Sequence, residues 1–386
     1  MVAVGGAAIV VIGLALLWPT RKVDETAADE GAPVHSWEGS LDPPRVAGRV
    51  VGFVVLVLAV LAGRVGDVRE LRNALPPLMV GAAWPLMVLL SATLGPVWRW
   101  LDPWDGAARI LAREPPQDDG RSVHLAALSA LALVWYLGIY ARPLDPPSVR
   151  LALGAYALAM VGGCLAVGRR WLGRTEVFGL FFGWLARLPR GRLGGWEPPR
   201  GTEIVLGVIA GGLLFGAIRR TGLWGGLNVV PGAMAWATLG LVASCSVVAG
   251  GLVALARRAE GGTAGASGEM AASVARAALP MVGAIALVVA MARSRFFTSL
   301  SLVPRAVSDP LGRGWDLFGT ADFPVSPPLP EPTLAVIQLG VLLAGALASV
   351  FLLSRLEPRH RTWGTLAVAF LACGGTMAVT LAPGAA

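Results

Sequence analysis

Residues 333–354 read TLAVIQLGVLLAGALASVFLLS, a run of 22 residues without a charged side chain. A helix of that length rises about 33 Å, which is enough to cross the roughly 30 Å hydrocarbon core of a bilayer. Gln338 is its most polar residue, and Arg355 bounds the run on its carboxyl side. The stretch therefore predicts a membrane-spanning α-helix.

The rest of the chain has the same character. Of its 386 residues, 55% are hydrophobic and only 15% are charged, with a mean hydropathy of +0.66. A soluble domain usually carries about 25% charged residues. Further apolar runs near 20 residues bring the number of expected spans to ten, at 2–18, 46–63, 75–95, 124–141, 149–167, 203–218, 232–256, 273–292, 333–354 and 363–382.

We therefore expect an all-α integral membrane protein, a single polytopic domain over 1–386 with about ten transmembrane helices and one or two interfacial amphipathic helices. The runs at 2–18 and 46–63 are the least secure. The first could also be a signal peptide, but it ends in Trp18-Pro19-Thr20-Arg21 without a small-residue cleavage site, which favours a retained helix.

The basic residues predict the orientation. Assigned to the nearest connection, 21 Lys and Arg fall on odd-numbered connections and 11 on even-numbered ones. Because cytoplasmic connections carry the excess of basic residues, the odd-numbered connections should be cytoplasmic, with both termini outside if all ten spans exist. Losing one span would place the carboxyl terminus inside.

Arginine accounts for 31 of the 32 basic residues, and the net charge is +8. One explanation is that guanidinium groups hold phosphate or lipid head groups, and the other is a GC-rich genome that encodes basic residues as Arg. We favour the second. Basic residues at helix ends suit a membrane protein, so membrane lipid is an expected partner and nucleic acid is not.

Two connections are too apolar for ordinary loops. Residues 96–112 carry Trp98, Trp100 and Trp104, which suit the membrane–water boundary. Residues 174–188 place an apolar face at helical spacing, and arginines flank it. We expect a helix there that either lies in the cytoplasmic interface or docks under the bundle. The candidate interface residues are Trp98, Trp100, Trp104, Glu176, Phe181 and Trp184.

The longest connection on the predicted outer side runs over 293–332. Its centre, 308–322, is rich in Gly, Pro, Asp and aromatic residues, so it should be turned and specific rather than helical. It is either a functional loop or a cap over helix ends. The candidate functional residues are Asp309, Arg313, Trp315, Asp316 and Asp322; the aspartates could bind a cation, but turn formation is favoured.

No motif for catalysis, a metal or a cofactor is present. The three cysteines and three histidines are dispersed, and no Walker A sequence or G-x-S-x-G nucleophile motif stands out. In the expected sixth span, two interleaved GxxxG patterns predict a close-packed helix face, within the bundle or against a partner subunit. The glycines concerned are Gly207, Gly211, Gly212 and Gly216.

Four segments, 16–21, 95–104, 174–182 and 308–322, together resemble an actinobacterial family of polytopic membrane proteins often labelled "fenitrothion hydrolase" or hypothetical membrane protein. The resemblance implies a multi-pass protein of the bacterial cytoplasmic membrane and a subunit of a larger assembly. Members carry a histidine near the end of the eighth span, where this chain reads Ala-Met-Ala-Arg. No family residue is carried over as catalytic.

Three functions follow as hypotheses. The first is a non-catalytic or co-catalytic subunit of a membrane complex that contacts a partner through the interfacial helix and the 308–322 loop. The second is a transporter or channel for a small or lipophilic solute, which needs the polar groups of the spans to converge on one cavity. They are Ser244, Ser246, Gln338, Thr376 and Thr380. The third is a membrane hydrolase acting through Asp309, Asp316 and Asp322.

Overall fold

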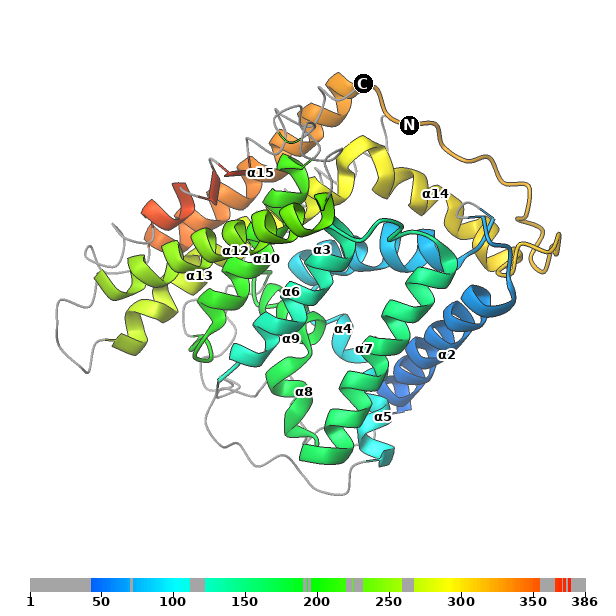
Figure 1. The fold of residues 1–386 in the computed structure, drawn as a ribbon, viewed down its shortest axis with the longest axis horizontal. Helices are drawn as coiled ribbons and strands as arrows, with labels where there is room; N and C mark the ends of the chain where they lie inside the picture. The colour runs from blue at the N-terminus through cyan, green and yellow to red at the C-terminus, as the bar shows by residue number, and fades with distance from the viewer. Residues whose placement is uncertain are drawn as a thin grey trace.

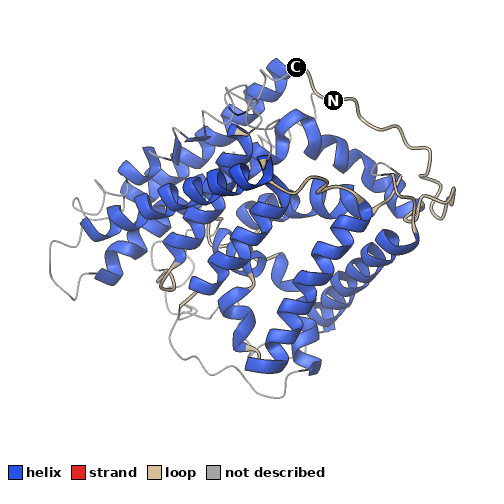
Figure 2. Cartoon of the chain, in the orientation of Figure 1, coloured by secondary structure: helices blue, strands red, loops and turns tan. Residues whose placement is uncertain are grey.

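A computed structural model describes most of the chain, and its secondary structure there is helical (Figure 2). The described residues are 43–69, 72–111, 122–189, 193, 196–219, 224, 232–258, 267–354, 365–369, 371–372 and 374–375. Within them, the sole β-type pairing is an isolated parallel bridge between Ser122 and Arg200. The expected all-α class is therefore confirmed for this part of the chain.

Six helices are long and apolar enough to cross a membrane. They are α2 (Pro43–Val65), the π-helix η2 (Pro76–Ala83) with its continuation α3 (Trp84–Thr93), α7 (Pro146–Val167), α12 (Ala233–Arg258), α13 (Ser267–Met291) and α15 (Glu331–Ser354). Shorter elements are α4 (Trp98–Leu101), α5 (Pro103–Leu111), α6 (His124–Gly138), α8 (Arg170–Thr175), α9 (Val177–Leu185), α10 (Thr202–Ile218), η4 (Ala292–Ser294) and α14 (Arg295–Ser308).

The expected count of about ten spans is not confirmed. The runs at 124–141 and 203–218 form α6 and α10, which are apolar but have only 15 and 17 residues. The run at 2–18 lies outside the described residues, and 363–382 is described only in part. The other six runs coincide with the six long helices within a few residues.

Segments far apart in the sequence meet at two ends of the helix bundle. At one end, Ser122 bridges Arg200, and Arg276 Nε donates to Trp196 O at 2.5 Å. At the other end, the N–H of Asp67 donates to Leu311 O at 2.8 Å. We call the first the broken-helix end, since α4, α5 and α8 lie there, and the second the loop end (Figure 1).

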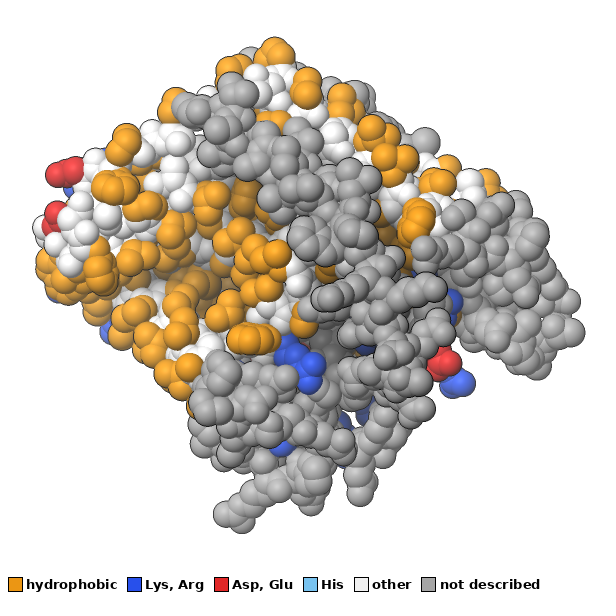
Figure 3. Space-filling model, turned by 180° about the vertical axis from the view of Figure 1, so that it is seen from behind, with side chains coloured by type: hydrophobic (Ala, Val, Ile, Leu, Met, Phe, Trp, Pro, Cys, Tyr) orange, Lys and Arg blue, Asp and Glu red, His pale blue; other side chains and the backbone are white. Residues whose placement is uncertain are grey.

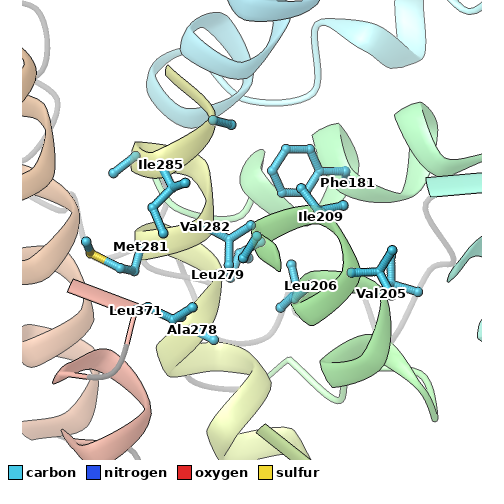
Figure 4. Packing of buried hydrophobic residues seen from close by; sticks show 14 of the residues in the cluster. Phe181, Val205, Leu206, Ile209, Ala278, Leu279, Met281, Val282, Ile285 and Leu371 are labelled. Atoms are coloured by element: carbon cyan, nitrogen blue, oxygen red, sulfur yellow. The ribbon is translucent and has the colours of Figure 1, made fainter. Parts of the chain in front are cut away.

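The core centres on α13, whose span is 83% buried by α3, α9, α10, α12 and α15 around it. Figure 4 shows side chains of α13 meeting those of α9 and α10, with Val282, Leu206 and Phe181 among them. By contrast, only 11% of the α2 span is buried. Its outer face is a continuous apolar surface, and hydrophobic side chains also cover wide areas of the described surface in Figure 3.

The glycines of α10 explain how α10 and α12 approach so closely. A Cβ at Gly207 would overlap the backbone of Ala249, and one at Gly211 would lie 2.7 Å from Cys245 Cα. Gly212 faces α6 instead, where an added Cβ would lie 2.5 Å from Val134 Cγ2. Gly216 meets nothing within 4 Å, so it takes no part in this packing. The glycine face therefore packs within the bundle rather than against another subunit.

Candidate functional site

Two short helix pairs meet at the broken-helix end, and each is interrupted by a carboxylate residue. Asp102 separates α4 from α5, with ψ 104°, and Glu176 separates α8 from α9, with ψ 95°. These extended ψ values end one helix and redirect the chain into the next. Trp98 of α4 packs edge-on against Phe182 of α9 at 5.3 Å between ring centroids, so the two pairs lie side by side.

Each carboxylate caps the helix that follows it. Asp102 Oδ1 accepts from the backbone N–H of Trp104 at 2.9 Å and of Asp105 at 3.2 Å. Glu176 accepts from the N–H of Phe178 at 3.1 Å and from the N–H of Gly179. Acidic residues are preferred at such positions because the first N–H groups of a helix have no partner inside it.

Tyr156 of α7 joins the two pairs. Its hydroxyl donates to Glu176 Oε1 at 2.7 Å. Its ring packs edge-on against Trp104 at 5.5 Å and against Phe178 at 5.7 Å. The tyrosine therefore lies between α5 and α9 and fixes the position of the Glu176 carboxylate.

Two arginines complete the network. Arg49 of α2 pairs with Asp105 Oδ2 at 2.7 Å, and Arg169, which precedes α8, lies 3.7 Å from Asp105 Oδ1. All three side chains are largely buried, with 9 to 13% of their surface exposed. A buried carboxylate requires such partners, since an uncompensated charge would be costly there. Asp105 thus ties α2, α5 and the α7–α8 junction together.

The electrostatics of the two break residues are unusual. Asp102 is 2% exposed and Glu176 is 0% exposed, and both lie outside the six candidate spans. Burial raises the pKa of Asp102 well above its ordinary value, and the charges of Glu176 and Asp105 raise it further. Burial also raises the pKa of Glu176, although the hydrogen bonds from Tyr156 and Gly179 oppose that rise.

This arrangement contains groups that can bind and release protons, namely carboxylates and a phenol, beside guanidinium groups. Among the described residues, no three His, Cys, Asp or Glu side chains gather in a way that could hold a metal ion. We call these residues the ion network: Arg49, Asp102, Asp105, Tyr156, Arg169 and Glu176.

The loop at the opposite end is held by its own side chains. Asp309 accepts from the N–H of Arg313 at 2.9 Å and of Gly314 at 2.7 Å. The Arg313 side chain donates to Val65 O, at the end of α2, at 2.9 Å. Asp309 thus forms a turn, as favoured over a cation site, and Arg313 anchors this loop (the aromatic loop, residues 309–323) to α2.

Ser308 and Asp316 close the aromatic loop. The Ser308 hydroxyl donates to Asp316 Oδ1 at 2.7 Å and accepts from the N–H of Phe318 at 3.0 Å. Asp316 also accepts from the N–H of Ala321 at 3.1 Å. These hydrogen bonds lower the pKa of Asp316, because they stabilise its charged form. Asp322 is exposed and has no described hydrogen bond to the other two aspartates.

The hydrogen-bonded aromatic loop presents apolar side chains outward. Trp315 is 42% exposed and Phe318 is 67% exposed, and Leu317 and Phe323 are exposed beside them. Such a cluster on an ordered loop marks a surface for another apolar surface, of protein or lipid.

The expected interfacial residues are only partly at a surface. Trp100 is exposed, but Trp104 is 5% exposed and packs inside against Tyr156. The helix expected over 174–188 is broken at Glu176, and its second part, α9, is buried on all sides with Phe181 and Trp184 inside. Of the two alternatives, an interfacial helix or one docked against the bundle, the burial of α9 favours packing against the bundle.

The polar groups of the spans do not converge on one cavity in the described part of the chain. Ser244 donates to Gly211 O of α10 at 2.8 Å, whereas Gln338 donates to Val288 O of α13 at 3.0 Å. Ser246 is exposed. Thr376 and Thr380 lie outside the described residues. The described groups thus serve separate helix contacts.

The ion network itself was not foreseen. The signal available was the position of Asp102 and Glu176 inside strongly apolar segments, where charged groups are costly unless paired. Nothing in the spacing of the sequence brings Arg49, Asp105 and Arg169 together.

Comparison with known proteins adds no assignment. No protein-family model matches the chain, and no curated protein and no solved structure matches it. The geometry above is therefore the basis for any functional conclusion.

Proposed function

We propose that the chain is a multi-pass integral membrane protein that serves as a non-catalytic subunit of a membrane complex. The membrane location is supported by six long apolar helices and by the bare outer face of α2. The α2 span of 20 residues rises about 30 Å, the thickness of a bilayer core. The resemblance stated above suggests the bacterial cytoplasmic membrane, and the distribution of basic residues suggests that the broken-helix end is cytoplasmic.

The proposal of a partner rests on the exposed side chains of the aromatic loop. Trp315, Leu317 and Phe318 form an apolar centre, and Asp309 and Arg313 lie at its polar margin. Protein interfaces have this anatomy, with aromatic residues enriched at the centre and a polar rim around them. The hydrogen bonds of the loop order it in advance, which reduces the entropy that binding would otherwise cost. The partner we propose is a second membrane subunit with an apolar surface.

The test is purification from the native host in a mild detergent. We expect a stoichiometric protein to accompany the wild type and to be lost from a Trp315→Ala, Phe318→Ala double variant. Trp100→Ala is the matched control, since Trp100 is equally exposed but lies at the opposite end. A wild-type particle without any other protein would contradict the proposal, and the loop would then be assigned to lipid.

One observation favours transport of a small or lipophilic solute as a second candidate. Helix breaks with buried polar groups are where many transporters bind their substrates and ions, and this chain has two such breaks side by side. A screen of solutes for thermal stabilisation of the purified chain tests it. A stabilising solute whose effect disappears in Glu176→Gln would support transport over a purely structural role.

The family label of a hydrolase has no support in the described residues. Asp309 and Asp316 are occupied as acceptors within turns, and Asp322 is not brought to them. Hydrolysis of a phosphate ester ordinarily uses water activated by a metal or by a base. We propose that these three aspartates shape the loop and do not catalyse a reaction.

A further inference from the structure

A proline-rich segment links the aromatic loop to α15. Residues 320–330 read TADFPVSPPLP and form neither helix nor strand, and Figure 1 shows them as an extended trace that runs back from the loop to α15. Because each proline fixes its own φ at about −65°, such a run favours the polyproline II helix, which has three residues per turn. Positions three apart in this segment therefore lie on one edge.

Side chains of α14 hold one edge of the segment. Arg305 Nε donates to Phe323 O at 2.6 Å, and the N–H of Ser326 donates to Ser301 Oγ at 3.0 Å. Three residues before Phe323, the hydroxyl of Thr320 donates to a carbonyl group of α14 at 2.7 Å. The bonded residues thus recur every three positions, as they would on one edge of a polyproline II helix.

The spacing along α14 agrees with this geometry. The N–H of Leu329 donates to Ser294 Oγ, just before α14, at 2.8 Å, and the Leu329 side chain packs against the main core. From Ser326 to Leu329 a polyproline II helix rises about 9 Å. The helical residues from Ser294 to Ser301 rise about 10 Å. The segment therefore runs antiparallel to α14 in matching steps and is ordered before any partner binds.

A second edge carries prolines and faces away from α14. Pro324, Pro327 and Pro330 are three residues apart, and all three are exposed. We call these three residues the proline ridge. A polyproline II helix makes no internal hydrogen bonds, so its carbonyl groups also stay free to accept.

We propose that the proline ridge is a docking surface for a water-exposed protein domain with a groove lined by aromatic side chains. Grooves of this kind bind P-x-x-P segments, because the preformed helix has little entropy to lose on binding. Asp322 and Glu331, both exposed, lie at the two ends of the ridge, so the groove that complements them carries basic residues at its rim. The contact is separate from that of the aromatic loop and does not require a second membrane subunit.

Fluorine NMR of proline-binding domains tests the ridge. Isolated SH3, WW and EVH1 domains, each with fluorotryptophan in its groove, are the probes, and each is titrated with the full-length protein in detergent. We expect a saturable change in the groove resonance of at least one probe. The triple variant Pro324→Ala, Pro327→Ala, Pro330→Ala keeps the side chains that bond to α14 and should weaken this binding about tenfold or more. Pro147→Ala is the control, because Pro147 is exposed in the first turn of α7, outside the ridge.

The same titration in nanodiscs separates a ridge that faces water from one that lies in lipid. The wild type should bind the probe equally well in detergent and in nanodiscs of phosphatidylethanolamine and phosphatidylglycerol. Loss of binding in nanodiscs would assign the ridge to lipid and overturn the proposal. It is also overturned if none of the three probes responds to the wild type, or if the triple variant binds as tightly as Pro147→Ala.

Discussion

The α10–α12–α13 region and the α2–α7 region differ in burial and in the polar bonds that join their helices. In the first, α13 is buried over 83% of its span, and glycines let α10 and α12 touch backbone to backbone. In the second, α2 is 11% buried, and ion pairs of Arg49 and Arg169 with Asp105 add to close glycine contacts, such as that of Gly52 with the backbone of Leu101. Close glycine packing thus occurs in both regions, and buried polar bonds are added in the second.

The largest effect should come from filling the glycine contact. Gly207→Val places side-chain atoms inside the backbone of Ala249, which cannot move aside, so we expect a loss of stability at or above about 3 kcal/mol, the upper end for overpacking. Gly216→Val is the matched control on the same helix, with open space at its Cβ. Thermal unfolding in detergent measures both; equal losses would mean that the glycine spacing does not set the α10–α12 contact.

A smaller loss is expected in the polar region. Arg49→Ala leaves Asp105 with Arg169 as its described cation, and we expect about 2 kcal/mol, below the usual cost of breaking a fully buried pair. Arg142→Ala breaks an exposed pair with Asp145 at 3.7 Å and should cost less than about 1 kcal/mol. If the two variants unfold at the same denaturant concentration, the buried Arg49–Asp105 pair stabilises the fold no more than the exposed Arg142–Asp145 pair does.

A substitution at Ser308 should change hydrogen exchange in the aromatic loop alone. Ser308→Ala removes the donor to Asp316 and the acceptor for the N–H of Phe318, each worth about 1 kcal/mol. We expect faster hydrogen exchange at Phe318 and Ala321, without a change at the helix cores. Ser301→Ala is a control, because the Ser301 hydroxyl donates to Thr298 O and accepts from the N–H of Ser326, both outside the aromatic loop. Unchanged exchange at Phe318 would show that the loop is ordered by other contacts.

The smallest effect on stability should come from Trp315→Ala. Its side chain is 42% exposed, so a change within about 0.5 kcal/mol is expected. Trp104→Ala, at 5% exposure, provides the contrast and should cost several times more, about 3 kcal/mol. Comparable losses for the two tryptophans would mean that the aromatic loop is part of the folded core.

The sequence predicted the six long apolar helices to within a few residues. An uncharged apolar run of about 20 residues, such as 333–354, is typical of a membrane-spanning helix. The sequence also predicted that the aspartates of the aromatic loop form turns, since Asp309 lies beside Pro310 and Gly312. It did not predict the break at Glu176, because the flanking residues Val177 to Leu185 continue a helical pattern. It also missed the network, because Arg49 and Asp105 meet only through the crossing of α2 over α5.

In the membrane location proposed above, the bare face of α2 would make the tilt of this helix depend on the thickness of the bilayer. A bilayer thinner than its roughly 30 Å span would be matched by tilting the helix, at a small cost per ångström. α13, enclosed by its neighbours, has no such freedom. Because Arg49 lies near the first turns of α2, a tilt would move its guanidinium group relative to Asp105. A change in lipid composition would then change the distance between the Arg49 guanidinium group and the Asp105 carboxylate, with no soluble ligand involved.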